Sequence, residues 1–377
     1  MAVGRIQVNA LNLMQGPFPT VEKYFLFIGV GATNVDQILY LNTDSDLDAE
    51  LGEADSELKR QVVAAKANAG QNWAAAAIPV ADGALWDAAV DFAMNNNIKV
   101  ETIVVCTPVT EQAQLTAMHA KAMDLNTTYG RRAFFIAGAR MIDSTPATGE
   151  SWSEYINDIK DLTETLSAFR VSIVPYIYDD AVGIYAGRLC NAQVSVADTP
   201  MRVATGSIIG QDQSTLPTDK NGIIYSNAHA IALNNQRFSV PAFYSDYEGV
   251  YWSDGQLLDA VGGDFTVVEN LRVIDKAARM VRIILIQLIG DRRFNSTASG
   301  EAWAIRKLSR PLKNMSKSTE FNGMTFPAEI KPYQDGDIVI NWITREKVEI
   351  YMVARPYSIP KDITANIMLD LSDPVAA

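Results

Sequence analysis

The stretch "YFLFIGVG" (Tyr24–Gly31) is a continuous apolar run that closes on small residues and decides how the first half of the chain is read. Three later runs have the same character, namely "VETIVVC" (Val100–Cys106), "RAFFIAG" (Arg132–Gly138) and "VSIVPYIY" (Val171–Tyr178). Strands that are apolar on both faces are typical of a parallel sheet covered by helices on both sides. These four runs therefore predict the buried strands of one sheet.

Amphipathic segments separate the apolar runs, and their lengths suit crossover helices. We expect helices at Asp46–Ala69, Gly83–Asn95, Glu111–Asn126, Trp152–Phe169 and Ala181–Asn191. Strands that alternate with helices of this length form an α/β domain with right-handed connections. The sequence thus predicts an amino-terminal α/β domain whose sheet is largely parallel, built on roughly residues 21–200.

The second half of the chain has a different pattern and predicts an α+β domain. Met201–Gly263 is rich in Gly, Ser, Asn, Asp and Tyr without a clear period, so we expect mostly surface loops there. A long helix is expected at Phe265–Ile289, with Arg272, Lys276, Arg279 and Arg282 opposite its apolar stripe. "DIVINWIT" (Asp337–Thr344) and "KVEIYMVAR" (Lys347–Arg355) predict an antiparallel hairpin.

Each end of the chain carries a short segment in which apolar and polar residues alternate. Ile6, Val8 and Ala10 alternate near the amino terminus, and in "DITANIMLDL" the apolar set is Ile363, Ala365, Ile367, Leu369 and Leu371. A period of two indicates a half-buried strand. Prolines separate both segments from their domains, so we divide the chain into an arm at 1–20, an outer domain at 21–260, an inner domain at 261–359 and an arm at 360–377.

Composition excludes several classes of function. The chain has 377 residues, a formal net charge of -12 and a pI near 4.7, so it repels a phosphate backbone and we expect no nucleic-acid partner. Cys106 and Cys190 are its two cysteines, and we expect both to be reduced and buried. No secretory signal is visible, and Met280–Ile289 is too short for a membrane span, so we expect no direct membrane insertion.

Residues for catalysis or cofactor binding are scarce. His119 and His229 have no second ligand at metal-binding spacing, and we expect no catalytic residue, metal or cofactor. "GVGATN" (Gly29–Asn34) follows a strand and invites a dinucleotide-binding interpretation, but Asn34 replaces the third glycine. A nucleotide-binding α/β enzyme that uses this turn remains the alternative hypothesis.

One block of the chain is basic. Residues 272–317 hold eleven Lys or Arg and three acids, a net charge of +8 in an acidic protein. Such a block can be a nucleic-acid patch, a solvated helix face or a docking surface for an acidic partner. It lacks the interleaved aromatic residues of a single-strand groove.

The stretch from Phe243 to Phe294, "FYSDYEGVYWSDGQLL…GGDFTVVENLRVIDKAARMVRIILIQLIGDRRF", resembles the contractile tail sheath proteins of bacteriophages, in particular a family of short sheath subunits. The hairpin and the last strand are similar to the carboxy-terminal domain of that family. The resemblance implies a non-enzymatic subunit of the virion, assembled in the host bacterial cytoplasm. It implies hexameric rings of the subunit stacked around a tail tube, which contract to drive the tube through the host envelope, with baseplate and tail terminator proteins as further partners.

The resemblance also implies roles for particular residues. The two arms would add strands to the sheets of neighbouring subunits, and the hairpin residues Ile338, Ile340, Val348, Ile350 and Met352 would belong to the accepting sheet. The surface facing the tube would be basic, and we assign to it Arg279, Arg282, Arg292, Arg293, Arg306, Lys307, Arg310 and Lys313. Another self-assembling tubular protein of different function remains open as a third hypothesis.

Overall fold

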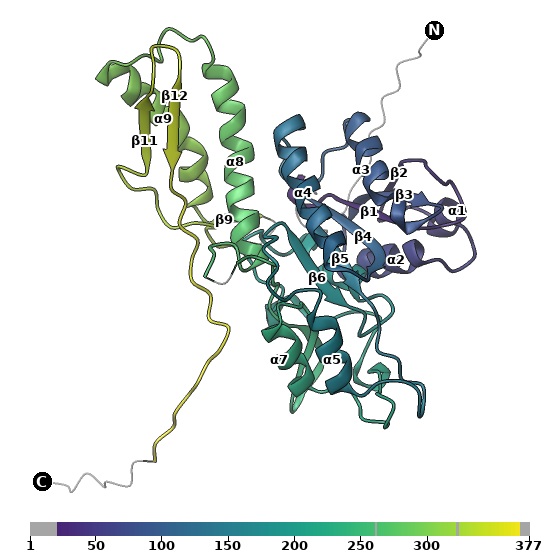
Figure 1. Cartoon of the computed structure of the whole chain (residues 1–377). Helices are drawn as coiled ribbons and strands as arrows, with labels where there is room; N and C mark the ends of the chain where they lie inside the picture. The colour runs from purple at the N-terminus through teal and green to yellow at the C-terminus, as the bar shows by residue number, and fades with distance from the viewer. Residues whose placement is uncertain (1–20, 261, 322–323, 370–377) are drawn as a thin grey trace, which may run out of the picture.

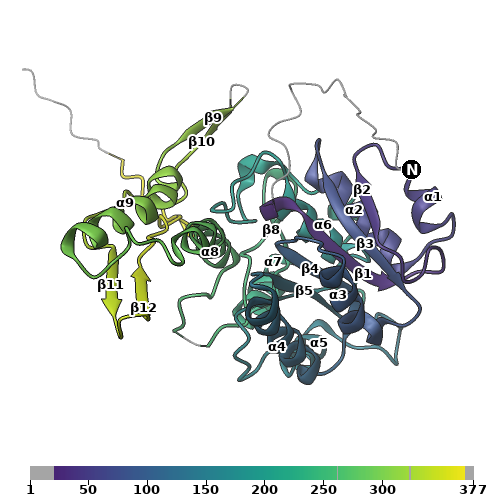
Figure 2. The same ribbon diagram turned by 90° about the horizontal axis from the view of Figure 1, so that it is seen from above.

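The computed structural model describes residues 21–260, 262–321 and 324–369, excluding the side chains of residues 321 and 324. Two bodies of secondary structure lie side by side (Figures 1 and 2). The larger one holds the α/β sheet, and the smaller one is built from the last two helices and the terminal hairpin. The predicted α/β and α+β halves are therefore both present.

A six-stranded sheet forms the centre of the larger body. Its order is β2-β3-β1-β4-β5-β6, and every neighbouring pair is parallel except β2 with β3. The strands are β1 (Phe25–Val30), β2 (Leu39–Asn42), β3 (Ala74–Val80), β4 (Thr102–Val109), β5 (Phe134–Ala139) and β6 (Val171–Pro175). The sequence analysis missed β2 and β3, because β3 reads "AAAAIPV" and lacks the branched residues that mark a strand.

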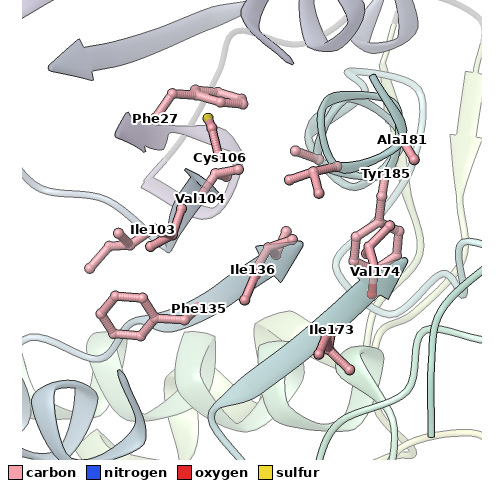
Figure 3. Close-up of a cluster of buried hydrophobic side chains, with 14 of the residues drawn as sticks. Phe27, Ile103, Val104, Cys106, Phe135, Ile136, Ile173, Val174, Ala181 and Tyr185 are labelled. Carbon is pink, nitrogen blue, oxygen red and sulfur yellow. The ribbon is translucent and has the colours of Figure 1, made fainter. Parts of the chain in front are cut away.

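Helices cover both faces of this sheet, as its continuous apolar strands require. In Figure 2, α2 and α6 lie on one face while α3 and α4 lie on the other. The helices are α1 (Leu47–Leu51), α2 (Glu57–Ala69), α3 (Trp86–Asn95), α4 (Gln112–Tyr129), α5 (Trp152–Lys160) and α6 (Ala181–Cys190). Figure 3 shows Phe27, Val104, Ile136 and Tyr185 converging in the core between the sheet and α6.

Two predicted helices are shorter than the sequence suggested. The segment Asp46–Ala69 is interrupted at Gly52, whose φ of 97° lies outside the helical region, and α2 begins anew where the Ser56 hydroxyl accepts a hydrogen bond from the Lys59 amide. Helix α5 ends at Lys160, because residues 161–169 form turns that lead into β6. Periodicity alone could not locate either break.

The segment 201–263 is more ordered than expected. It contains α7 (Asn227–Asn235) and an antiparallel pair, β7 (Pro241–Tyr244) and β8 (Tyr247–Trp252). These elements are too short for a hydrophobic period to stand out. Helix α7 packs against α5 and extends the core of the larger body.

The smaller body is built on α8 (Val268–Leu288) and α9 (Ala298–Met315). Two antiparallel pairs follow, β9 (Thr319–Phe321) with β10 (Met324–Phe326), and β11 (Ile338–Trp342) with β12 (Val348–Met352). Helix α9 was not predicted, although its buried residues Ala304, Leu308, Leu312 and Met315 recur every three or four positions; Pro311 within the run is a helix-breaking signal. The β11–β12 hairpin lies inside the predicted bounds.

A separate apolar core holds this smaller body together. Val281 of α8, Leu308 and Leu312 of α9 and Ile338 of β11 are all buried in it. The first turns of α8 belong to the other core, since Val268 and Leu271 pack with the α/β domain. Helix α8 is therefore shared by both bodies.

Candidate functional site

The turn after β1 does not form a nucleotide site. Gly29 lies inside β1, where an added Cβ would come within 2.7 Å of the Cβ of Cys106, so this glycine serves close strand packing. The chain then enters β2 and not a helix, and the Asn34 side chain is held by the Glu50 carbonyl at 2.9 Å. A pyrophosphate needs a helix amino terminus directly after such a turn. The nucleotide interpretation therefore lacks its structural basis.

The histidines and cysteines have packing roles. His229 accepts a hydrogen bond from the Ser226 amide at the start of α7 and stacks on Trp152, while His119 lies edge-on to Phe169. Cys106 and Cys190 are free thiols, and burial raises the pKa of both, that of Cys190 to about 12. Burial was predicted for both.

The described residues offer neither a metal-binding cluster nor a membrane-spanning helix. Across residues 21–369, leaving out 261, 322 and 323, His, Cys, Asp and Glu do not gather in groups that could hold a metal ion. Over the same residues, the helices lack the combination of length and apolarity that crossing a membrane requires.

The basic face of α8 is the interface between the two bodies. Arg272 donates two hydrogen bonds of 2.9 Å to the carboxylate of Glu101, and both side chains are 1% exposed. One turn further, Asp275 accepts two hydrogen bonds from Arg170, at 2.8 and 3.0 Å. Burial raises the pKa of Glu101 although Arg272 opposes the shift. Of the three interpretations of the basic block, none fits these residues of α8, because their charges are buried and paired within the chain.

Arg279 therefore does not belong to an exposed basic surface. Its guanidinium donates to a carboxylate oxygen of Glu22 at 3.3 Å and to the Arg132 carbonyl at 3.2 Å, and it lies 3.8 Å from Glu101. The Arg282 guanidinium lies beside Gly130 at the end of α4, and the residue is exposed. Periodicity placed both residues on the correct face of α8 but could not show what covers that face.

The remaining basic residues gather on α9 and on the loop before it. The indole of Trp303 makes cation–π contacts with two residues: the Lys307 amine lies 4.5 Å and the Arg293 guanidinium 4.7 Å from the ring centroid. The Lys313 amine lies 4.9 Å from the Tyr333 ring. We call this set the basic surface; it comprises Arg292, Arg293, Arg306, Lys307, Arg310 and Lys313.

The β11–β12 hairpin is a two-stranded sheet with an apolar face on each side. Ile338, Ile350 and Met352 contribute to the core of the smaller body. Ile340 is the register partner of Ile350 and Val348 that of Trp342, so both lie on the same face of the hairpin, where they are half-buried. On the outer face, Val339 and Tyr351 are 51% and 57% exposed. In the described part of the chain, β11 and β12 pair with each other alone, so each keeps one open edge. The five hairpin residues named from the sequence thus face their own domain, and a strand could be accepted through the backbone edges.

A groove lies beside β12. It has a volume of about 450 Å³ and runs between the hairpin, α8 and the end of α4. Ile350, Met352, Val281 and Leu285 give it an apolar wall, and Arg132 lies on the opposite side. An apolar side chain brought to this edge of the hairpin would find room and matching surface.

The carboxy-terminal segment leaves the domain without pairing. Residues 362–369 form no secondary structure, and Ile363, Ile367 and Leu369 are 76%, 96% and 81% exposed. Figure 1 shows this segment, in yellow, running away from both bodies. The predicted strand is absent from these residues within the single chain. Ile6, Val8, Ala10 and Leu371 lie outside the described residues.

Sequence analysis missed one residue at the root of this segment. Lys361 makes ion pairs of 2.5 Å with Asp254 and 2.7 Å with Glu269. The three residues are far apart in the sequence and carry no common motif, so nothing short of the tertiary structure could have brought them together.

Comparisons with known proteins cover nearly the whole chain. The family models "DUF2586, N-terminal domain" and "DUF2586, C-terminal domain" match residues 3–256 and 264–372. A protein of Haemophilus phage HP1 (strain HP1c1) with the name "Putative tail sheath protein" is 42% identical over 368 residues, which are 97% of this chain and 98% of that protein.

Solved structures extend the likeness at the level of the fold. The sheath complex of an extracellular contractile injection system in its contracted state has a TM-score of 0.62 at 12% identity, covering 98% of each chain. The sheath tail protein of Desulfitobacterium hafniense has a TM-score of 0.55 at 11% identity, covering 93% of this chain and 96% of that one.

Proposed function

The chain belongs to the DUF2586 family and to the contractile tail sheath proteins of bacteriophages, and from this premise we propose that it polymerises into stacked hexameric rings around a tail tube. Contraction of the stack drives the tube through the host envelope. The subunit is a structural component of the virion, and we place its assembly in the host bacterial cytoplasm. Its role is non-enzymatic, in keeping with a turn after β1 that leads into β2 and not into a helix.

The observation that carries this proposal is the pairing of an open hairpin with an unpaired apolar segment in one chain. Among the described residues, each strand of β11–β12 has a free edge, and residues 362–369 leave their own domain with their apolar side chains in solvent. Open edges and exposed isoleucines favour aggregation unless a partner covers them. Strand addition between copies answers both needs, because the backbone supplies hydrogen bonds and alternate side chains fix the register.

We assign the acceptor to the neighbouring copy's hairpin. The groove beside β12 offers an apolar wall to the set Ile363, Ala365, Ile367, Leu369 and Leu371. Burying one large aliphatic side chain contributes about 1.5–3 kcal/mol. Two such residues contribute about 3–6 kcal/mol to the link between subunits, and the backbone hydrogen bonds of the added strand contribute further. The amino-terminal arm, with Ile6, Val8 and Ala10, is proposed to pair with the second open edge.

The domain division follows from the same roles. We propose arms at residues 1–20 and 360–377, an outer domain at 21–260 and an inner domain at 261–359. The inner domain then contains the hairpin that accepts the arms, and the outer domain provides the contacts that change on contraction. Such a sheath needs no nucleotide, because its assembled state is poised in a minimum of higher free energy and a trigger only lowers the barrier.

We further propose that the basic surface faces the tail tube. The chain carries a net charge of -12, so a local cluster of six cations on α9 and its preceding loop is set apart from the remainder of the molecule. Complementary charge guides docking and fixes orientation. Baseplate and tail terminator proteins would contact the two ends of the stack.

Electron microscopy of arm variants tests the proposal. The unmodified protein should form hollow tubes, and removal of residues 362–377 or the double change Ile367→Asp and Leu369→Asp should leave a folded chain that does not polymerise. Met368→Asp is the matched control, since residue 368 points to the opposite face of an added strand. Normal tubes from the truncated protein would refute strand exchange through this arm.

A further inference from the structure

The segment between the hairpin and the free arm crosses from one body to the other. It begins where Arg355 pairs with Asp337 at 2.7 Å and Pro356 bridges to Ile330. It ends at Lys361, whose partners lie at the edge of the α/β domain. We call residues 356–361 the strap.

The strap passes over a cavity and not over a packed surface. The cavity has a volume of about 360 Å³, and Tyr357 and Ile359 of the strap form part of its lining. Ser195 and Val273 line it from the two bodies underneath. Tyr357 remains 47% and Ile359 36% exposed, so side-chain burial holds the middle of the strap weakly.

Lys361 is the attachment at the far end of the strap. Its amine lies 2.5 Å from an oxygen of Asp254, which follows β8, and 2.7 Å from an oxygen of Glu269 in the first turn of α8. The Asp254 and Glu269 side chains are 11% and 6% exposed. In the described part of the chain, Lys361 is the cation that pairs with both of these carboxylates.

The two carboxylates around Lys361 favour a cation at this position. Burial raises the pKa of Glu269, and the Lys361 charge works against that shift. Burial alone would lower the pKa of Lys361, but Glu269 and Asp254 outweigh it and the pKa is raised. Two neighbouring buried carboxylates repel each other unless a positive charge lies between them. The Lys361 amine therefore compensates the charge of both carboxylates and attaches the strap at this point.

We propose that Lys361 is a positioning residue for the carboxy-terminal arm. Its contact with Asp254 and Glu269 sets the residue at which the free arm begins, and it holds the strap against the two bodies, so that the length of the strap is released when the contact opens. This inference rests on the proposed function, because the arm has to link subunits. With the contact made, the free arm begins at Asp362. When the contact opens, it begins at Pro356.

The difference in reach is large on the scale of subunit movements. An extended chain spans about 3.4 Å per residue, so release of the six strap residues, 356–361, lengthens the arm by about 20 Å. Opening the contact thus supplies about 20 Å without breaking the link at the arm's tip. A sheath whose subunits move apart during contraction can use this length.

The same geometry predicts an effect on assembly. From the root of the arm to Ile367 there are six residues when the contact is made and twelve when it is open. The effective concentration of a tethered group falls as about the -3/2 power of the tether length, which gives a decrease of about threefold. The protein concentration needed for polymerisation should rise by a similar factor.

The test uses a spin label on the full chain at Ser358→Cys, an exposed position in the middle of the strap, since Cys106 and Cys190 are buried and do not compete for the label. Electron paramagnetic resonance of the unassembled protein should show a restricted label, and Lys361→Gln should make it mobile. The critical concentration for tubes should rise about threefold in the same variant. Lys361→Arg should preserve both values.

Two further variants separate the contact from general destabilisation. Asp254→Asn with Glu269→Gln removes both buried charges and opens the contact without altering the arm, so it should reproduce the effects of Lys361→Gln. Lys160→Gln breaks a surface pair of 2.8 Å with Glu164 and should change neither value. Circular dichroism verifies the fold of each variant.

An unchanged label mobility in Lys361→Gln, or a label that is already mobile in the unmodified protein, overturns the proposal. So does an unchanged critical concentration. Failure of the proposed function has another signature: tubes that form without residues 362–377 refute the linking role of the arm, while the mobility of the label still reports whether the contact exists.

Discussion

Replacing Arg272 by methionine should destabilise the protein more than any change to a surface ion pair. The guanidinium and the Glu101 carboxylate are each 1% exposed and share two hydrogen bonds of 2.9 Å. Removing one partner of such a pair leaves a buried, uncompensated charge and costs about 3–5 kcal/mol. Arg279 lies 3.8 Å from Glu101 and compensates in part, so we expect a loss of about 3 kcal/mol in the free energy of unfolding.

Urea denaturation of the unassembled protein measures this loss by tryptophan fluorescence, since Trp73, Trp152 and Trp252 are buried in the folded state. The double variant Arg272→Met with Glu101→Leu removes both charges and should be more stable than Arg272→Met alone. As a control, Arg60→Met breaks an exposed pair of 3.3 Å with Asp55 and should cost no more than about 1 kcal/mol.

The loss should also depend on pH. Burial raises the pKa of Glu101 in the folded state, and removing Arg272 takes away the group that opposes this shift. A carboxyl with a raised folded-state pKa stabilises the fold below its unfolded pKa and loses this contribution as the pH rises through the folded value. The Arg272→Met variant should therefore be closest to the parent near pH 4 and fall behind as the pH rises. A loss below about 1 kcal/mol at pH 7, or a double variant whose loss equals the sum of the two single losses, refutes the reasoning.

Three shorter predictions address other parts of the molecule. Arg306→Glu with Arg310→Glu should permit empty tubes but weaken their attachment to the tail tube in a co-sedimentation assay, and unchanged attachment removes that role from the basic surface. Gly29→Ala brings a methyl group within 2.7 Å of the Cys106 Cβ and should cost about 1–3 kcal/mol in urea denaturation, whereas a neutral change would show that the strands can separate. Burial and, to a lesser extent, repulsion from Arg272 lower the pKa of Lys23 from 10.5 to about 8, so the folded state loses this proton at a lower pH than the unfolded state does. The free energy of unfolding should therefore rise with pH between about 8 and 10.5, relative to the variant Lys23→Met. Equal slopes for the two proteins would contradict this.

Much of the α/β domain was accessible from sequence because its strands are apolar on both faces. The runs that became β1, β4, β5 and β6 differ clearly from the amphipathic helices between them. The strand β3 escaped prediction because alanine gives a weak strand signal, although Ala75, Ala76 and Ala77 are completely buried. Helix α9 was not predicted because Pro311 breaks the run, although Ala304, Leu308, Leu312 and Met315 form an apolar stripe at helical spacing.

The candidate assembly surfaces divide in the same way. The alternation in residues 362–369 predicted a strand, which these residues do not form in the described part of the chain, whereas the two strands of the hairpin were predicted correctly from their periods. The basic residues were counted correctly, but their surroundings were not known. Arg272 and Arg279 face the α/β domain, while Arg306 and Arg310 are exposed on α9.

The sequence by itself determined the class of each domain, the absence of catalytic motifs and the alternating arm, because these depend on local composition and period. The tertiary structure decided which charges are buried and which are free, since that depends on what each helix face packs against. It also decided where the arm begins: Lys361 meets Asp254 and Glu269 across more than ninety positions of sequence, and only the folded chain brings such distant groups within 2.7 Å of one another.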